Sequence, residues 1–128
     1  MRYDLISDVL SAIKNGDDYG KKEVVTPASK AIKSILLLLQ KHGYIGDFEL
    51  IDDKKGGKFK VQLLGKVNSC SSVRPRVYVR KDEYEKYEKR FLPAAYFGFL
   101  IVSTSKGIMT HTTAKEKGYG GVLLGYVY

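Results

Sequence analysis

"FLIVSTSKGIMTHTTAKEKGYGGVLLGYVY", residues 99–128, determines more of the fold than any other stretch of this chain. Its first five residues, 99–103, begin with an unbroken apolar run, which is typical of a strand buried on both faces. Residues 122–128 are apolar and partly β-branched, and they are predicted to form a closing strand. Between these strands lies a segment of small hydroxyl side chains, lysines and glycines, few of which could serve a core.

Periodicity divides the rest of the chain into helices and strands. Apolar residues at helical spacing predict one helix over residues 5–15, ended by Gly16, and another over 28–42. Runs rich in β-branched or alternating residues predict strands over 22–26, 44–52, 58–64 and 73–81, and a short helix is expected over 82–90. The small, polar segment 65–72 is the best candidate for a linker. The predicted fold class is α+β with two small lobes, an N-terminal α-β-α-β-β lobe at 1–65 and a C-terminal, mostly β lobe with short helices at 66–128.

The charge of the chain indicates the class of its partner. Twenty-two Lys and Arg against 14 Asp and Glu give a net charge of +8. A basic protein of this size is expected to bind a polyanion, most often a nucleic acid, although lysines that only maintain solubility are the alternative. From Lys54 to Lys81 the chain has nine cations and no acid, which favours a binding surface. No apolar run reaches the about 20 residues that cross a bilayer, and the first residues lack a signal peptide's pattern, so we expect a cytosolic protein with no membrane partner.

Metal, cofactor and enzyme sites have little support in the sequence. Cys70 is the only cysteine, and the two histidines are far from it along the chain, so we expect no metal site. Glycine-rich nucleotide loops are absent, and neither a cofactor nor a small-molecule substrate is expected. The pattern Ser-x-x-Lys occurs at 11–14 and at 103–106, but the other parts of such a catalytic site are missing. A small hydrolase that uses Ser103 and Lys106 is therefore the rival to a non-catalytic binding protein.

The polar segment after the buried strand has two parts with different interpretations. Thr113-Ala-Lys-Glu116 fits a capping box and Gly118 would end a short helix, so Thr113 is predicted to be the helix cap. Capping does not explain the residues that follow the strand directly, which are Ser103, Thr104, Ser105, Lys106 and Gly107. There, short hydroxyls on a rigid edge would lose little rotamer entropy on binding. The wide, shallow minor groove of RNA, with its 2′-hydroxyls, fits such a surface, and an ordinary polar turn is the alternative.

Two of the predicted strands carry cations on one face. In the strand over 73–81, alternation separates the valines Val73, Val77 and Val79 from a basic face that consists of Arg74, Arg76, Tyr78 and Arg80. In the strand over 58–64, Lys58 and Lys60 face away from the apolar side. Contacts of Arg and Lys with phosphates position a protein on a nucleic acid rather than read its sequence. These two faces, together with the hydroxyl segment, favour RNA binding.

The segment 103–128 resembles the C-terminal signature of the eighth small-subunit ribosomal protein family, and the resemblance covers essentially the whole chain. "DVLSAIKNG" (8–16) is similar to that family's first helix and "VVTPASKAI" (24–32) to its strand-to-second-helix junction. "KHGYIGDFE" (41–49) resembles the following turn and strand, and "RPRVYVRKDE" (74–83) the entry to the second lobe. Two features depart from the bacterial pattern. Val122 stands where bacterial members usually carry an acid, and the connection 82–98 is longer and resembles the archaeal and eukaryotic branch.

The resemblance implies a fold of two α/β lobes and an early, direct role in assembly. It implies binding to the central domain of small-subunit ribosomal RNA, with the C-terminal lobe in the minor groove of an irregular helix. Carried over by motif, the groove contact would be lined by Ser103, Thr104, Ser105 and Gly107. From the first lobe, RNA would be approached by Lys14 and Asn15 at the end of the first helix, and by Ser29 and Lys30 at the start of the second, a helix N-terminus suited to a phosphate.

We therefore predict a non-catalytic, structural protein of the small ribosomal subunit, located in the cytoplasmic ribosome. Its expected partners are the central domain of small-subunit ribosomal RNA and neighbouring small-subunit ribosomal proteins. The aromatic residues of the connection, Tyr84, Tyr87, Phe91 and Tyr96, are expected to pack on the lobe, with contact to a neighbouring ribosomal protein as the alternative. The alternative function is an RNA-binding regulatory module that acts on messenger RNA or a protein partner outside the ribosome.

Overall fold

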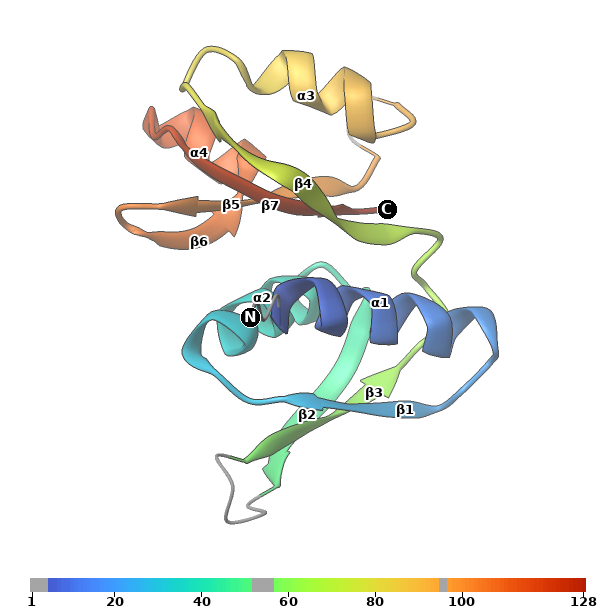
Figure 1. Cartoon of the computed structure of the whole chain (residues 1–128). Helices are drawn as coiled ribbons and strands as arrows, with labels where there is room; N and C mark the ends of the chain where they lie inside the picture. The colour runs from blue at the N-terminus through green and yellow to red at the C-terminus, as the bar shows by residue number, and fades with distance from the viewer. Residues whose placement is uncertain (1–4, 52–56, 95–96) are drawn as a thin grey trace. The chain divides into compact units, whose positions relative to one another are not determined.

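The computed structural model describes residues 5–51, 57–94 and 97–128; the side chains of Arg74 and Pro75 also lie outside the description. The chain forms two compact units, Met1–Asn68 and Ser69–Tyr128. The division falls inside segment 65–72, where the sequence predicts the linker. In the described residues each unit has one antiparallel sheet and two helices (Figure 1), which confirms the predicted α+β class.

The first unit follows the predicted order α-β-α-β-β. Its elements are α1 (Leu5–Asp18), β1 (Glu23–Pro27), α2 (Lys30–Lys41), β2 (Ile45–Ile51) and β3 (Lys58–Leu63). The strands form a sheet in the order β1-β3-β2, and both helices lie on the same face of it (Figure 1). The core consists of apolar residues at helical spacing on α1 and α2 and of alternate residues on β3: Val9, Leu10, Ile13, Ile32, Ile35, Leu36, Leu39, Phe59, Val61 and Leu63.

Helix α1 extends one turn beyond its predicted end because Gly16 does not terminate it. Gly16 is buried inside the helix, and a Cβ there would lie 2.7 Å from Val24 and 2.5 Å from Leu63. The absence of a side chain at Gly16 therefore lets α1 approach the sheet closely. The glycine serves this packing and does not end the helix as predicted. Gly43, with a φ of 79°, does follow α2 as expected of a helix-ending glycine.

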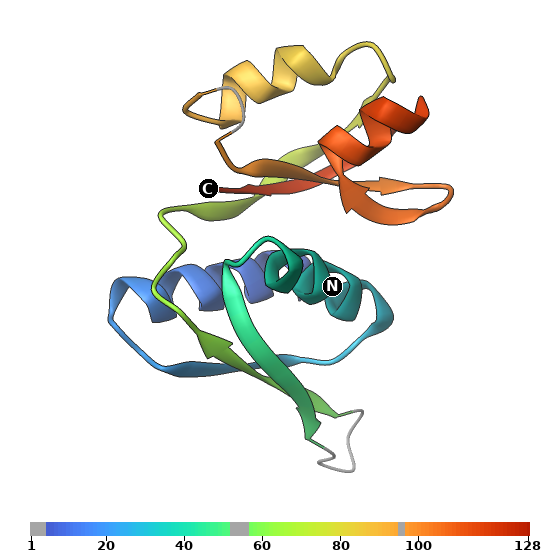
Figure 2. The ribbon, with the colours of Figure 1, turned by 180° about the vertical axis from the view of Figure 1, so that it is seen from behind.

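The second unit consists of a four-stranded sheet and two helices. Its elements are β4 (Cys70–Val79), α3 (Tyr84–Phe91), β5 (Phe99–Thr104), β6 (Gly107–Thr110), α4 (His111–Lys117) and β7 (Gly121–Val127). The strand order is β4-β7-β5-β6, and both helices lie on one face of the sheet (Figures 1 and 2). The buried strand β5 and the closing strand β7 confirm the interpretation of segment 99–128. No described helix in either unit combines the length and apolarity needed to span a bilayer.

The connection between β4 and β5 supplies much of the core of the second unit. Tyr84 is fully buried and Tyr87 is 9% exposed, so the prediction that they pack on the lobe is confirmed. Burial raises the pKa of Tyr84, whose hydroxyl donates a hydrogen bond to the carbonyl of Tyr119 over 2.7 Å. Phe91 is partly buried and packs against the same cluster, while Tyr96 lies outside the described residues.

Candidate nucleic-acid interface

The hydroxyl segment forms the tip of a tight hairpin. Strand β5 pairs with β6 so that Thr104 lies opposite Gly107, which leaves Ser105 and Lys106 as the turn. The Thr104 hydroxyl accepts a hydrogen bond from the Lys106 amide (3.1 Å) and donates one to the Gly107 carbonyl (2.8 Å). Gly107 has a φ of 118°, which other residues adopt only with strain. The tip is thus held by its own backbone and one hydroxyl, while Ser105 and Lys106 are exposed.

The fold joins this tip to a row of residues that runs across the sheet. Ser103 lies opposite Ile108 of β6 on one side and opposite Val122 of β7 on the other. Val122 in turn lies opposite Tyr78 of β4. Directly opposed residues in antiparallel strands point to the same face, so the four side chains share one face. Val102 and Leu123, in the adjacent row, belong to the core under α3 and α4, so the row lies on the face away from those helices.

Tyr78 is the prominent member of this row. Its side chain is 67% exposed, whereas Ser103, Ile108 and Val122 are partly buried. The sequence predicts Tyr78 and Ser103 as binding residues on separate strands, and the pairing through Val122 brings them together. Ile108 was not predicted to lie on this surface, and Val122 was noted only as a departure from the bacterial pattern, because strand order and register decide their position.

Paired glycines bring β7 close to the neighbouring strands. A Cβ on Gly121 would meet the backbone carbonyl of Ser103 and would lie 2.9 Å from Val102 Cγ1. A Cβ on Gly120 would lie 2.8 Å from the carbonyl oxygen of Val79 and 3.0 Å from the Tyr78 hydroxyl. Any larger side chain at either position would displace the backbone that carries the exposed row.

The remaining residues of the basic face have different surroundings. Arg74 lies in β4, but its side chain is outside the description. Arg76 lies where the register of β4 and β7 shifts, and its Nη1 donates to the carbonyls of Val73 (3.0 Å) and Leu124 (2.8 Å). Arg80 is exposed just after the strand, and its amide donates to the Glu83 carboxylate over 3.0 Å. Arg76 therefore bonds backbone groups of its own sheet, whereas the side chains of Tyr78 and Arg80 are exposed to solvent.

In the first unit, the predicted residues on the helices lie at three different kinds of position. Lys14 forms an ion pair with Asp18 (3.1 Å), and because α1 continues to Asp18, neither Lys14 nor Asn15 is at its end. Ser29 is the N-cap of α2, and its Oγ accepts a hydrogen bond from the Ile32 amide over 3.1 Å. Lys30 is the first residue of that helix and is exposed. The start of α2 keeps the predicted combination of a helix N-terminus and a lysine.

Lys58 and Lys60 lie on the outer face of the first unit's sheet. The Lys60 ammonium is 3.5 Å from a carboxylate oxygen of Glu23. The hollow beside it is also lined by Asp47 and Glu49. These carboxylates would repel a phosphate, so the surroundings of Lys60 disfavour the contact predicted for it.

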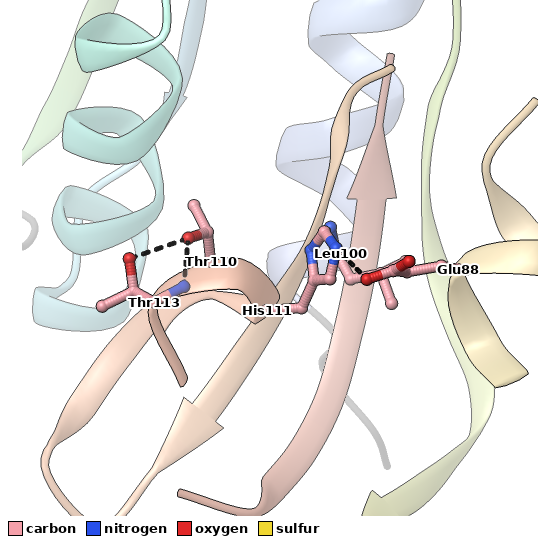
Figure 3. A network of polar contacts seen from close by, with 5 residues as sticks. All are labelled: Glu88, Leu100, Thr110, His111 and Thr113. Carbon is pink, nitrogen blue, oxygen red and sulfur yellow. Dashed lines mark hydrogen bonds and ion pairs between the residues drawn. The ribbon is translucent and has the colours of Figure 1, made fainter. Parts of the chain in front are cut away.

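Helix α4 begins three residues earlier than the capping box predicts. Thr110 is the N-cap, and its Oγ1 accepts a hydrogen bond from the Thr113 amide over 3.2 Å (Figure 3). Thr113 lies inside the first turn, and its hydroxyl is 3.1 Å from that of Thr110. The prediction of Thr113 as the cap is wrong because a threonine of equal capping ability lies one turn before it, where β6 ends. Gly118, with a φ of 73°, ends the helix as predicted.

His111, the first residue of α4, joins three elements in the interior. Its Nδ1 accepts a hydrogen bond from the Leu100 amide of β5 (3.0 Å), and its Nε2 lies 2.8 Å from the Glu88 carboxylate of α3 (Figure 3). Burial lowers the pKa of His111, while Glu88 opposes this effect. An accepting Nδ1 requires the unprotonated nitrogen, so the ring is neutral and donates from Nε2. In the described part of the chain, no three His, Cys, Asp or Glu side chains are grouped to hold a metal ion.

Comparison with known protein families gives one finding that covers both units. The family model described as ribosomal protein S8 matches residues 4–128. The match includes the hairpin tip, the exposed row and the start of α2.

Proposed function

The chain belongs to the ribosomal protein S8 family and is a ribosomal protein of the small subunit; from this premise we propose that it binds the central domain of small-subunit ribosomal RNA directly and helps its assembly. The proposed role is structural rather than catalytic, in the cytoplasmic ribosome and beside other small-subunit proteins. The long connection that contains α3 favours a ribosome of the archaeal or eukaryotic type.

The observation that carries the proposal is the exposed hairpin tip on a buried root. Residues 99–102 are at most 4% exposed, whereas Ser105, Lys106 and Gly107 are exposed. A tip fixed in this way loses little conformational entropy when it binds. Small hydroxyls and a glycine allow close approach to a wide, shallow groove that displays 2′-hydroxyls. We assign the groove contact to Ser103, Ser105 and Gly107, with Lys106 at its edge and Thr104 as the residue that closes the turn.

The exposed row extends this contact across the sheet. Tyr78 offers both a ring and a hydroxyl, and Arg80 follows it at the end of β4. Val122 between Ser103 and Tyr78 adds no charge, so the surface along the row is neutral and its cations lie at the margins. Such an arrangement suits recognition of groove shape, with phosphates held at the edges.

A second contact is proposed for the start of α2 in the first unit. The free amides of a helix N-terminus attract phosphate oxygens, and Ser29 and Lys30 are both exposed there. Lys14, Asn15 and Lys58 are exposed or partly exposed on the same unit and are assigned a supporting role.

Substitution of the two tip serines tests the groove contact. We expect Ser103→Ala combined with Ser105→Ala to weaken binding to the cognate RNA helix about tenfold or more, since each hydrogen bond lost contributes about 0.5–1.5 kcal/mol net. Thr104 is left in place because its hydroxyl holds the turn. The matched control is Ser69→Ala with Ser71→Ala, which removes the two hydroxyls on either side of Cys70, where β4 begins. Binding by the tip variant that equals wild type would identify these serines as ordinary turn residues.

Chemical footprinting of the purified protein on complete small-subunit RNA tests the location. Protection confined to the central domain is expected. Protection elsewhere would contradict the assignment to that domain. Co-sedimentation with small subunits at high salt separates the ribosomal role from an RNA-binding module that acts on messenger RNA or a protein, because such a module would leave the subunits.

A further inference from the structure

Helix α2 exposes a stripe of lysines along its whole length. Lys30, Lys33 and Lys41 are exposed, and Leu37 between them is 47% exposed. At 3.6 residues per turn these four residues fall within an arc of about 80°. The buried residues Ile32, Ile35, Leu36 and Leu39 lie on the opposite side of the helix. We name Lys30, Lys33 and Lys41 the lysine stripe.

The lysine stripe has no counter-charge on its own helix, unlike some of the other lysines. Helix α2 contains no acidic residue. Among the described residues, no ion pair is formed by a lysine of the stripe. By contrast, Lys14 pairs with Asp18, Lys60 with Glu23 and Lys89 with Glu85.

An acid of β2 that contacts α2 is bonded to an amide of that helix. The Gln40 side chain donates a hydrogen bond to the Asp47 carboxylate over 3.1 Å. Next to the helix, burial lowers the pKa of His42, and the charge of Lys41 lowers it further. The outer side of α2 is therefore positively charged from its first residue to its last.

Helix stability does not account for two of the three lysines. The N-terminal end of a helix carries a partial positive charge, which disfavours cations in the first turn. Lys30 is the first helical residue and Lys33 the fourth, so both stand at the unfavourable end. Only Lys41, in the last turn, is favourably placed. An anionic partner would offset the unfavourable position of Lys30 and Lys33.

We propose that the lysine stripe binds the phosphate backbone of an RNA strand along α2, well beyond the phosphate expected at the helix N-terminus. This inference rests on the proposed function and extends it to Lys33 and Lys41. From Lys30 to Lys41 the helix rises about 16 Å, and a nucleic-acid duplex presents several phosphates over such a length. The stripe thus forms a track for phosphates rather than a single anion site.

The test compares the salt dependence of RNA binding in two variants that each lose two positive charges. The first is Lys33→Gln with Lys41→Gln, which leaves Ser29 and Lys30 intact. The matched control is Lys86→Gln with Lys89→Gln on α3, where Lys89 is already paired with Glu85. Each phosphate contact contributes about 0.7–0.9 to the slope of log affinity against log salt. We expect the first variant to lower that slope by about 1.4–1.8, and the control to leave it near the wild-type value.

The outcomes separate this inference from the proposed function. Thermal melts of all three proteins confirm that the folds are comparable. If the wild type binds small-subunit RNA and the two variants share its slope, the stripe does not contact phosphates and the inference is overturned. It is also overturned if Lys33→Gln with Lys41→Gln keeps full RNA affinity but fails to enter small subunits, because the stripe then meets a protein. A wild type without salt-dependent RNA binding would overturn the proposed function as well.

Discussion

At the residue scale, the sequence and the structure suggest different roles for Arg76. From the sequence it is a cation on an exposed strand face. In the structure its guanidinium donates to the carbonyls of Val73 and Leu124. These carbonyls lie in a bulge, where β4 has four residues and β7 has one between the pairs Ser72–Gly125 and Val77–Leu123. Bulged backbone leaves carbonyls without ladder partners, and Arg76 supplies the missing donors. Its role in the structure is therefore in the sheet, and contact with a phosphate stays a prediction from the sequence.

Substitution of Arg76 separates these roles. Arg76→Ala is expected to reduce the free energy of unfolding by about 1–3 kcal/mol, because two partly buried carbonyls lose a donor. Denaturant unfolding measures this loss. Arg76→Lys is the companion variant, since it keeps the charge but not the planar donor group. A phosphate contact would lower the salt slope of RNA binding by about 0.7–0.9 in Arg76→Ala and not in Arg76→Lys. Unchanged stability in both variants would contradict the role in the sheet.

At the element scale, the β5–β6 hairpin is anchored at its base by His111. Strand β6 ends at Thr110, which leaves the Leu100 amide of β5 without a strand partner on that side, and the His111 ring accepts from it. The same ring donates to Glu88 of α3, so one side chain ties the hairpin to the helix that covers it (Figure 3). The tip that carries Ser105 thus depends on an interior contact at the other end of the hairpin.

This contact predicts a pH dependence of stability. Burial holds the pKa of His111 below its ordinary 6.5, with the charge of Lys115 acting in the same direction and Glu88 acting in the opposite one. As pH falls below about 6.5, the unfolded state binds a proton that the folded state resists, so the free energy of unfolding decreases until pH reaches the lower folded value. Above pH 6.5 the contribution is constant.

Unfolding of wild type and His111→Gln between pH 7.5 and 5 measures this contribution. The variant keeps His42, whose pKa is also lowered, so the difference between the two proteins isolates His111. We expect the stability of wild type to fall more steeply toward acid pH than that of the variant. Identical pH dependence would show that protonation of His111 is not resisted by the fold.

At the scale of the whole molecule, each unit has its own proposed contacts with RNA. The second unit offers the hairpin tip, Tyr78 and Arg80, while the first offers the start of α2. Some acidic residues lie away from these contacts, as in the hollow beside Lys60. With a net charge of +8, the chain can keep these acids and still attract a polyanion.

If both units bind one RNA independently, the effects of substitutions in them should add. We expect Ser103→Ala with Ser105→Ala in the second unit and Lys30→Gln in the first each to weaken RNA binding. In the combined variant the two losses in binding free energy should sum within about 0.3–0.5 kcal/mol. Titration of the cognate RNA fragment with all four proteins completes the cycle. A Lys30→Gln variant that binds as wild type would contradict the contact proposed at the start of α2.

Much of the fold was predictable from the sequence because its signals are local. The buried stripe of α2 follows from 3.6-residue spacing, the apolar face of β3 from alternation, and the buried strand β5 from an unbroken apolar run. The exposed tip at Ser105 and Lys106 was predictable for the same reason, since hydroxyls and a glycine follow that run directly. In each case neighbouring residues decide the conformation.

The sequence by itself determined the two α+β units, the helices and strands, the basic character and the hydroxyl tip. Only the tertiary structure decided that Ser103 and Tyr78 share a row through Val122, that Arg76 bonds the carbonyls of a bulge, that Lys60 lies among carboxylates, and that Thr110 rather than Thr113 caps α4. The physical reason is that strand order, register and bulges depend on pairing between segments far apart in the chain. Local periodicity records which side of a strand is buried, but not which strand lies next to it.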